Sequence, residues 1–398
     1  MLEIGLVGKP NVGKSTFFEA STLAGVEIAN YPFTTIKANR GIGYLRTRDP
    51  GPDLGVESEP KNSILRGDTR LVPVELLDVA GLVPDAHSGK GLGNQFLDDL
   101  RQAKVLIHVI DASGSTDIEG NPVDRGSHDP GEDVDFLVRE IDHWFHNIII
   151  RDWIKISRTA ESSHTPVERL LAEKLTGLGI NIHHIADTIH HLQLDERPTR
   201  WTDDQMMELS SELRKRSKPI LIAANKADRA DDEQLRSLES SAGDFMVIPT
   251  CSEAEMALRK ADKAGLINYV PGDGDFEIPD PSRLSAAQKN ALEVIRGVLE
   301  RFGSTNVQKV LETAAYELLE LIVVYPVEDE HRFTDHDGRV LPDAYLMRKG
   351  STARDLAYRV HTDLGDHFIR AIDCRTGRSI GADHELKMGD VVKIHSNA

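Results

Sequence analysis

The sequence predicts an α/β protein whose doubly wound, mostly parallel sheet carries a helical insertion and is followed by a small C-terminal β-grasp unit. Three observations support this fold class. Apolar runs typical of buried strands occupy residues 4–7, 105–111 and 219–224, and each leads into a polar segment. Apolar residues recur at helical spacing between residues 134 and 178. Beyond residue 320, strand-like segments surround one helix-like segment, which indicates the β-grasp unit.

The bulk composition excludes several classes of protein. Among 398 residues, 65 acidic against 47 basic side chains give a net charge of −18, which disfavours sequence-blind adhesion to nucleic acid over the whole surface. Only Cys251 and Cys374 are present, too few for a disulfide framework or a four-cysteine zinc site. No apolar run approaches the roughly 18 residues of a membrane helix, so we expect a cytoplasmic protein without a membrane contact. The acidic balance fits salt adaptation and compositional drift equally well.

The run Gly8–Thr16 directly follows the first apolar strand and has the spacing of a phosphate-binding loop. Glycines at both ends let successive backbone amides point inward, and the next helix adds the positive end of its dipole. Lys14 is placed to reach the outer phosphates, and the Ser15 hydroxyl to complete the shell of a Mg²⁺ ion. The predicted nucleotide-binding residues of this loop are Gly8, Lys9, Pro10, Asn11, Val12, Gly13, Lys14, Ser15 and Thr16.

A second set of candidate residues follows two further strand-like segments. Asp78 ends such a segment and is placed to hold Mg²⁺ through water, while the amide of Gly81 is placed to sense the terminal phosphate. Between the phosphate loop and this acid, the Thr35 hydroxyl is our choice to close over the metal, with Thr34 as the alternative. The predicted catalytic residues are therefore Lys14, Thr35 and Gly81, and the predicted Mg²⁺ residues are Ser15, Thr35 and Asp78.

The nucleotide base is expected to be guanine. The apolar run 219–224 leads into Asn225-Lys226-Ala227-Asp228, and the Asp228 carboxylate can accept two hydrogen bonds from guanine that adenine does not offer. In this interpretation Asn225 braces the loop and Lys226 lies along the ring. A later loop that contains Cys251 and Ser252 is predicted to offer a backbone N–H to guanine O6.

With these motifs in place, the chain resembles the Obg-like, YchF-related translation-factor GTPases of the TRAFAC class, in particular an archaeal branch with a C-terminal TGS domain. The resemblance rests on the runs at residues 8–15, 31–35, 78–83, 89–97 and 225–228. It implies an OBG-type G domain at residues 1–115 and 216–272, a helical insertion at 116–215, a helical connector at 273–319 and a TGS domain at 320–398. Some relatives have an altered base-reading motif and prefer ATP, but here the motif is intact.

The residue that orients the attacking water is the open point of this interpretation. Ras-type switches use a glutamine after the switch glycine, and here that position is Leu82, which cannot orient water. The alternatives are another side chain, the metal and backbone, a partner, or a monovalent cation. The resemblance implies that Asn11 helps to bind K⁺. His87 and His108 are candidate helpers, although a hydrogen-bonded core histidine is the alternative for His108.

The predicted insertion has a metal-binding alternative of its own. Five side chains would approach one another on a helix and could hold a transition metal, or could simply form a solvated polar face. These residues are His183, His184, Asp187, His190 and His191.

The sequence therefore predicts a slow, Mg²⁺-dependent GTPase, with K⁺ as an optional cofactor, that reports GTP or GDP binding to the ribosome or RNA through the TGS domain and the insertion. Two alternatives stay open. One is a nucleotide-gated ribosome-binding or RNA-binding module with negligible hydrolysis, and the other is an ATP-preferring YchF-like ATPase. Basic residues of the C-terminal unit fit an RNA contact or a solvated mixed-charge surface.

Overall fold

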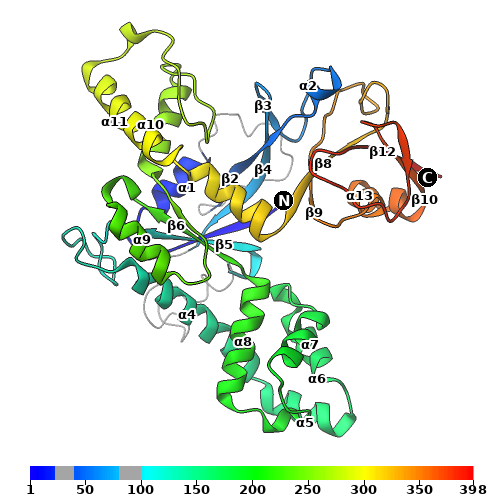
Figure 1. Cartoon of the computed structure of the whole chain (residues 1–398). Coiled ribbons are helices and arrows are strands. Elements are labelled where there is room, and N and C mark those ends of the chain that lie inside the picture. Colours follow the sequence, from blue (N-terminus) through cyan, green and yellow to red (C-terminus); the bar gives the residue numbers. More distant parts are fainter. Residues whose placement is uncertain (23–39, 80–99, 398) are drawn as a thin grey trace.

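A central sheet of seven strands organises the molecule (Figure 1), which is a computed structural model that describes residues 1–22, 40–79 and 100–397. The strand order is β2-β4-β1-β5-β6-β7, with β3 paired to β4. The pairs among β4, β1, β5, β6 and β7 are parallel, and β2 and β3 run antiparallel to β4. The strands are β1 (Glu3–Val7), β2 (Arg40–Arg48), β3 (Ile64–Arg66), β4 (Thr69–Asp78), β5 (Val105–Asp111), β6 (Ile220–Asn225) and β7 (Val247–Pro249).

Helices cover both faces of this sheet, so the predicted doubly wound α/β fold is confirmed. On one face, Ile4 and Leu6 of β1 share a core with helices α1 (Lys14–Thr22) and α12 (Val307–Glu312). On the other face, Val7 and strand β5 pack against α4 (Pro130–Ile150). Because successive strand residues point to opposite faces, one apolar run serves two cores. Helices α9 (Asp232–Ser241) and α10 (Ser252–Lys263), with the short α2 (Gly51–Leu54), complete this part.

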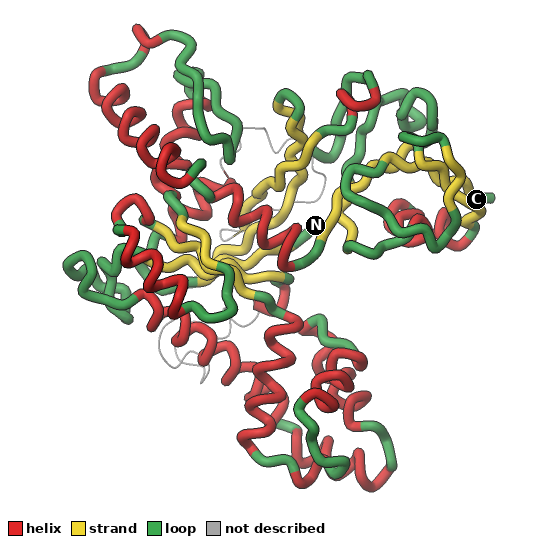
Figure 2. Tube along the Cα trace, in the orientation of Figure 1, coloured by secondary structure: helices red, strands yellow, loops and turns green. Residues whose placement is uncertain are grey.

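A helical lobe extends from the sheet between β5 and β6 (Figure 2). Its core forms because apolar residues of α4 recur every three or four positions, as with Leu137, Ile141 and Trp144, and face the other helices. At its far end the rings of Trp153 and Trp201 stack with centroids 5.2 Å apart. Besides α4 the lobe contains α5 (Trp153–Ser163), α6 (Val167–Leu175), α7 (Ile182–His191) and α8 (Asp203–Ser217).

The C-terminal unit has a sheet of its own, in the order β11-β10-β12-β8-β9, as predicted for a β-grasp unit. It follows α11 (Ala286–Phe302), α12 and a π-helical turn, Thr313–Leu318. The strands are β8 (Leu321–Val327), β9 (Tyr345–Arg348), β10 (Phe368–Asp373), β11 (Arg378–Ile380) and β12 (Val391–Ser396), and the helices are α13 (Ala353–Val360) and α14 (Thr362–Asp366).

Among the residues that the structure describes, no helix is long and apolar enough to cross a membrane.

One buried arginine joins the two sheets. Arg70, near the start of β4, has no exposed surface, and its Nε donates to the buried Asp49 carboxylate at 2.9 Å. Its Nη2 donates to the Leu341 carbonyl of the C-terminal unit at 2.7 Å, and the guanidinium lies over the Tyr325 ring at 5.4 Å. Backbone hydrogen bonds from residues 59 and 61 to carbonyls of residues 340 and 342 extend this contact. The C-terminal unit is thus fixed to the β2–β4 side of the central sheet.

Replacing Arg70 with methionine should lower the free energy of unfolding by about 3–5 kcal/mol, because Asp49 would keep a buried charge without its partner. The control is Arg48→Ala on the neighbouring strand, whose ion pair with Asp53 is largely exposed and should matter by no more than about 1 kcal/mol. Urea unfolding followed by circular dichroism measures both. Equal losses for the two variants would contradict the role given to Arg70.

Candidate functional site: a phosphate loop and a base-recognition loop

The phosphate loop has a backbone that only glycine can provide at two positions. Gly8 has φ +156°, and a Cβ there would lie 2.4 Å from the Val109 carbonyl oxygen. Gly13 has φ +94°, and a Cβ there would lie 2.3 Å from Nδ2 of Asn225. The loop therefore packs directly against β5 and against the last residue of β6. Helix α1 begins at the next residue, Lys14, and its N-terminal end faces the loop.

Two predicted site residues from distant parts of the sequence meet beside this loop. The Lys14 ammonium contacts the Asp78 carboxylate and donates to the Val79 carbonyl at 2.8 Å. Asp78 is the last residue of β4, which pairs in parallel with β1, so both strands end at the same edge of the sheet. Ser15 is exposed in the first turn of α1. A lysine and a carboxylate therefore meet where a phosphate chain would end, and Ser15 follows that lysine directly in α1.

The base-recognition loop is tied to the phosphate loop by side chains. Nδ2 of Asn225 donates to the Val12 carbonyl at 2.9 Å, and Oδ1 of the same amide accepts from the Ser252 N–H at 3.1 Å. Lys226 adopts a left-handed backbone with φ 58°, and its ammonium donates to the Asn11 carbonyl at 2.9 Å. Asn225 thus braces this loop, as the sequence suggested. A cavity of about 60 Å³ lies between the two loops, lined by Gly13, Thr16, Asn225, Lys226, Asp228, Arg229, Ser252 and Glu253.

Asp228 and the loop of Cys251 and Ser252 approach this cavity from two sides. The Cys251 N–H donates to the Thr305 carbonyl at 2.9 Å, and the Ser252 N–H donates to Oδ1 of Asn225. Burial raises the pKa of the Cys251 thiol to about 12, so the thiol stays protonated. The predicted amide contact with guanine O6 would therefore require one of these two N–H groups to exchange its protein acceptor.

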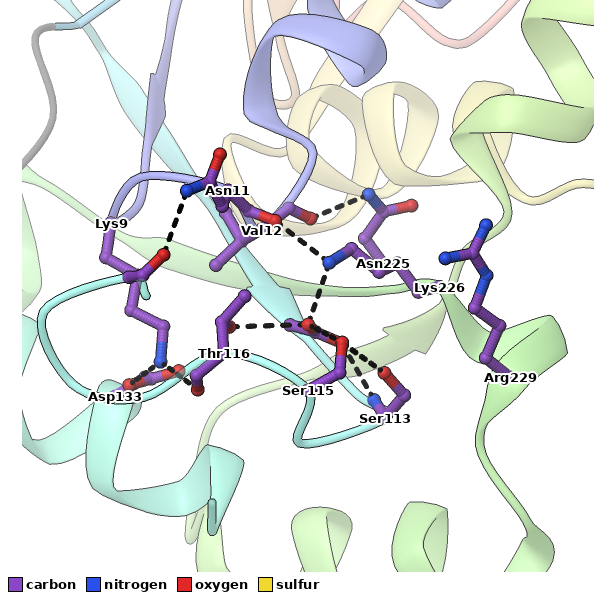
Figure 3. A network of polar contacts seen from close by, with 12 residues as sticks. Lys9, Asn11, Val12, Ser113, Ser115, Thr116, Asp133, Asn225, Lys226 and Arg229 are labelled. Atoms are coloured by element: carbon purple, nitrogen blue, oxygen red, sulfur yellow. Dashed lines mark hydrogen bonds and ion pairs between the residues drawn. The ribbon is translucent and has the colours of Figure 1, made fainter. Parts of the chain in front are cut away.

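The sequence analysis did not predict the residues at the end of β5 that hold the base-recognition loop in place (Figure 3). Asp111 is 1% exposed at the end of β5 and accepts from the Lys226 ammonium at 2.8 Å. Burial alone would raise the pKa of Asp111, but hydrogen bonds from Lys226, Ser113 and Ser115 outweigh it and hold that pKa below its ordinary value. One feature of the sequence could have indicated this role: Asp111 is an acidic residue at the carboxyl end of β5, a strand that pairs with β1.

A second missed contact links the phosphate loop to the helical lobe. The Lys9 ammonium is buried, donates to Oδ1 of Asp133 at 2.8 Å and donates to the Thr116 carbonyl at 3.0 Å. Asp133 lies in the first turn of α4, and His128 contacts the same carboxylate oxygen at 2.9 Å. Figure 3 shows Lys9 pointing toward this helix, away from Lys226. Lys9, predicted only as part of the nucleotide loop, therefore also anchors α4.

Several predicted residues lie outside the described ranges. They are Thr34, Thr35, Gly81, Leu82 and His87. His108, by contrast, is 3% exposed on β5, and its Nδ1 has no hydrogen-bond partner within the described part of the chain. Burial, aided by the positive charge of Lys9, lowers the pKa of His108 to about 3. The imidazole is therefore neutral at physiological pH.

The histidines of α7 do not form a metal site in the described structure. Among the described residues, the group of three candidate ligands close enough to share an ion is instead Asp335, His336 and Asp337, on the surface of the C-terminal unit. Exposed acidic groups of this kind are common without a metal. Within residues 182–191 the structure thus favours the solvated polar face over the transition-metal alternative.

The site combines three parts: a glycine-rich phosphate loop after β1, a carboxylate at the end of the neighbouring strand β4, and a base-recognition loop after β6. This combination defines a P-loop nucleotide-binding protein of the G-protein class. Three family descriptions match the chain in order. They are "50S ribosome-binding GTPase" at residues 3–143, "Obg-like GTPase YGR210-like, G4 motif-containing domain" at 223–329 and "TGS domain" at 331–396.

Whole-chain comparisons agree with these matches. The chain is 50% identical to an uncharacterized GTP-binding protein of Methanocaldococcus jannaschii, over all of both chains. It is 45% identical, with a TM-score of 0.81, to the crystal structure of a GTP-binding protein from Pyrococcus horikoshii, covering 99% of this chain and 100% of that one. It is 28% identical to the ribosome-binding ATPase YchF of Haemophilus ducreyi, covering 92% and 86% of the two chains. The protein belongs to the YchF/Obg-like GTPase family.

Gly13→Ala should weaken the binding of GDP by about tenfold or more, because the new methyl group would displace Asn225 and the backbone conformation would be strained. Gly177→Ala, in the helical lobe, is the control because no atom lies within 4 Å of its Cβ position. Calorimetric titration of both variants with GDP measures the effect. Wild-type affinity in Gly13→Ala would show that the loop does not hold the phosphates.

His108 should make the protein less stable in acid. Its pKa is about 3 in the folded state and close to 6.5 in the unfolded chain, so the unfolded state binds more protons between these values and stability falls as pH drops below 6.5. Relative to wild type, His108→Met should therefore gain about 2 kcal/mol between pH 7.5 and pH 5. Urea unfolding at both pH values measures the difference. An unchanged difference would show that His108 is not buried in its neutral form.

Proposed function

We propose that the protein binds GTP in preference to ATP, hydrolyses it slowly with Mg²⁺, and acts as a nucleotide-dependent switch on the ribosome. The main support is the base cavity, where Asp228 lines the same space as Asn225 and Lys226, both of which are hydrogen-bonded to the phosphate loop. A carboxylate fixed there recognises the paired N–H donors of guanine and finds no such pair on adenine.

Mg²⁺ fits the oxygen atoms gathered near Lys14. Ser15 supplies a hydroxyl and Asp78 a carboxylate at the end of β4, and both are ligands or water-bridged ligands that this ion prefers. Thr35, or Thr34 in its place, is our proposed third contributor. The bound ion would neutralise charge on the terminal phosphates, while Lys14 would hold those phosphates in place.

We propose that a K⁺ ion stabilises part of the charge that develops on the phosphates during hydrolysis. Leu82 stands where a water-orienting glutamine is used in other switches, so charge stabilisation has to come from elsewhere. Nδ2 of Asn11 donates to the Gly120 carbonyl at 2.9 Å, which fixes the amide and leaves Oδ1 as the atom able to bind a cation. The buried, neutral His108 is a poor candidate for proton transfer at physiological pH.

The ribosomal partner is proposed from the names of relatives and from one family description. The YchF relative in Haemophilus ducreyi is named a ribosome-binding ATPase, and residues 3–143 match a family described as ribosome-binding GTPases. The word ATPase in the relative's name keeps ATP as the second candidate substrate for this chain. The intact Asn225-Lys226-Ala227-Asp228 sequence is the observation that favours GTP.

Phosphate release measured with GTP and with ATP, with and without ribosomes, tests this function. We expect slow release with GTP, faster release with ribosomes, little release with ATP, and slower turnover when NaCl replaces KCl. Faster release with ATP would establish the ATPase alternative. Nucleotide-dependent cosedimentation with ribosomes but no phosphate release would establish the binding-module alternative, and equal rates in the two salts would remove K⁺ from the proposal.

Asp228→Asn should weaken GTP binding by about a hundredfold or more and should bind xanthosine triphosphate better than wild type does. An amide cannot accept both hydrogen bonds from guanine, but its N–H can donate to the second carbonyl of xanthine. Glu239→Gln, an exposed change on α9 that removes the same charge, should leave both affinities unchanged. Competition with a fluorescent GDP measures these affinities. Unaltered base preference in Asp228→Asn would remove Asp228 from base recognition.

A further inference from the structure

A large cavity lies in the helical lobe, outside the nucleotide site. It has a volume of about 890 Å³, is open to solvent, and is lined by the end of α5, the turn before α6, one side of α7, residues 193–196, Pro198 and Trp201. This volume is in the range of sites that bind ligands in proteins. Figure 1 shows α5 at the end of the lobe that points away from the central sheet, with α6 and α7 nearer to the sheet. We refer to this feature as the lobe groove.

The floor of the lobe groove is apolar and ordered. Ala160, Val167 and Trp201 contribute buried side chains, and Ile189 and Leu194 contribute partly buried ones. The Trp201 indole N–H donates to the Asp195 carbonyl at 2.7 Å, which fixes the ring against Trp153. An apolar side chain that entered the groove would therefore meet a preformed surface, without first having to order it.

The rim of the lobe groove is acidic. Four carboxylates line it, from Glu161, Glu168, Asp195 and Glu196, and none of the lining residues is a lysine or arginine. Glu161 accepts two hydrogen bonds from Thr199, and Asp195 lies 3.6 Å from Arg200, just outside the groove. Among the residues that the structure describes, Glu168 and Glu196 have no ion-pair partner. The rim therefore keeps a negative charge that cationic groups of a ligand can neutralise.

We propose that the lobe groove binds a basic peptide segment of a protein partner. An apolar side chain of the segment occupies the floor, and lysine or arginine residues on either side of it pair with Glu168 and Glu196. RNA does not suit this surface, because phosphates would face four carboxylates. The groove thus gives the helical lobe a protein ligand, and this proposal does not depend on the nucleotide that the G-protein site binds.

The test uses the full-length protein and a synthetic hexapeptide in which a lysine and an arginine stand on each side of two leucines. Titration is followed by calorimetry and by tryptophan fluorescence, which reports on Trp201 in the groove. We expect saturable binding of this peptide and no saturable binding when serines replace the leucines or glutamates replace the basic residues. Failure of the first peptide to saturate, or equal binding of the serine peptide, overturns the proposal.

Matched charge reversals locate the binding site. Glu168→Lys with Glu196→Lys should weaken the peptide on the order of tenfold, through the loss of two exposed ion pairs. Glu173→Lys with Glu208→Lys makes the same change of net charge on exposed positions outside the groove and should change affinity less than twofold.

The neutral pair Glu168→Gln with Glu196→Gln provides a milder variant, expected to fall between wild type and the reversal. Circular dichroism checks the fold of each variant. Equal weakening by the groove reversal and by the control reversal would show general charge attraction, and saturable binding of single-stranded poly(U) RNA to the peptide-free protein, with a change in tryptophan fluorescence, would show a nucleic-acid surface. Either result overturns the proposal.

Discussion

The two nucleotide-facing loops depend on hydrogen bonds that join their backbones through side chains. Asn225 and Lys226 donate to carbonyls of Val12 and Asn11, more than two hundred positions earlier in the chain. These bonds set the distance between the phosphate end and the base end of the site before any nucleotide arrives. Because one N–H of Asn225 and the ammonium of Lys226 are used in this way, Asp228 is the member of the motif whose polar group is left to read the base.

Buried ion pairs around the site hold side chains in place, but burying their charges costs desolvation free energy. Asp111 and Asp133 are almost completely covered, yet each accepts a lysine ammonium, and both lysines belong to the nucleotide loops. Removing water from such pairs is unfavourable, and their mutual attraction repays it only while the geometry is kept. They are therefore better understood as devices that hold Lys9 and Lys226 in one position than as sources of stability.

Much of this arrangement is local and could be predicted from sequence. Gly8, Gly13, Lys14 and Asp78 stand in short motifs whose spacing follows from backbone conformation, and the strands and helices carry clear apolar periods. Other contacts could not be predicted, because they join segments that lie far apart in the chain and no local sequence pattern indicates that these segments meet. They are the contacts of Lys9 with Asp133 and of Arg70 with Asp49 and Leu341. A lysine in a phosphate loop suggests a phosphate partner, so its burial against α4 becomes visible only when the fold is known.

The length of strand β4 is itself a constraint. Its ten residues, Thr69–Asp78, hold Arg70 against the C-terminal unit at one end and present Asp78 beside Lys14 at the other. Adding or removing one residue would turn every following side chain to the opposite face and shift one end by about 3.3 Å. The length of the strand thus sets the distance between the contact of Arg70 with the C-terminal unit and the contact of Asp78 with Lys14, so an insertion or deletion within β4 would disturb both.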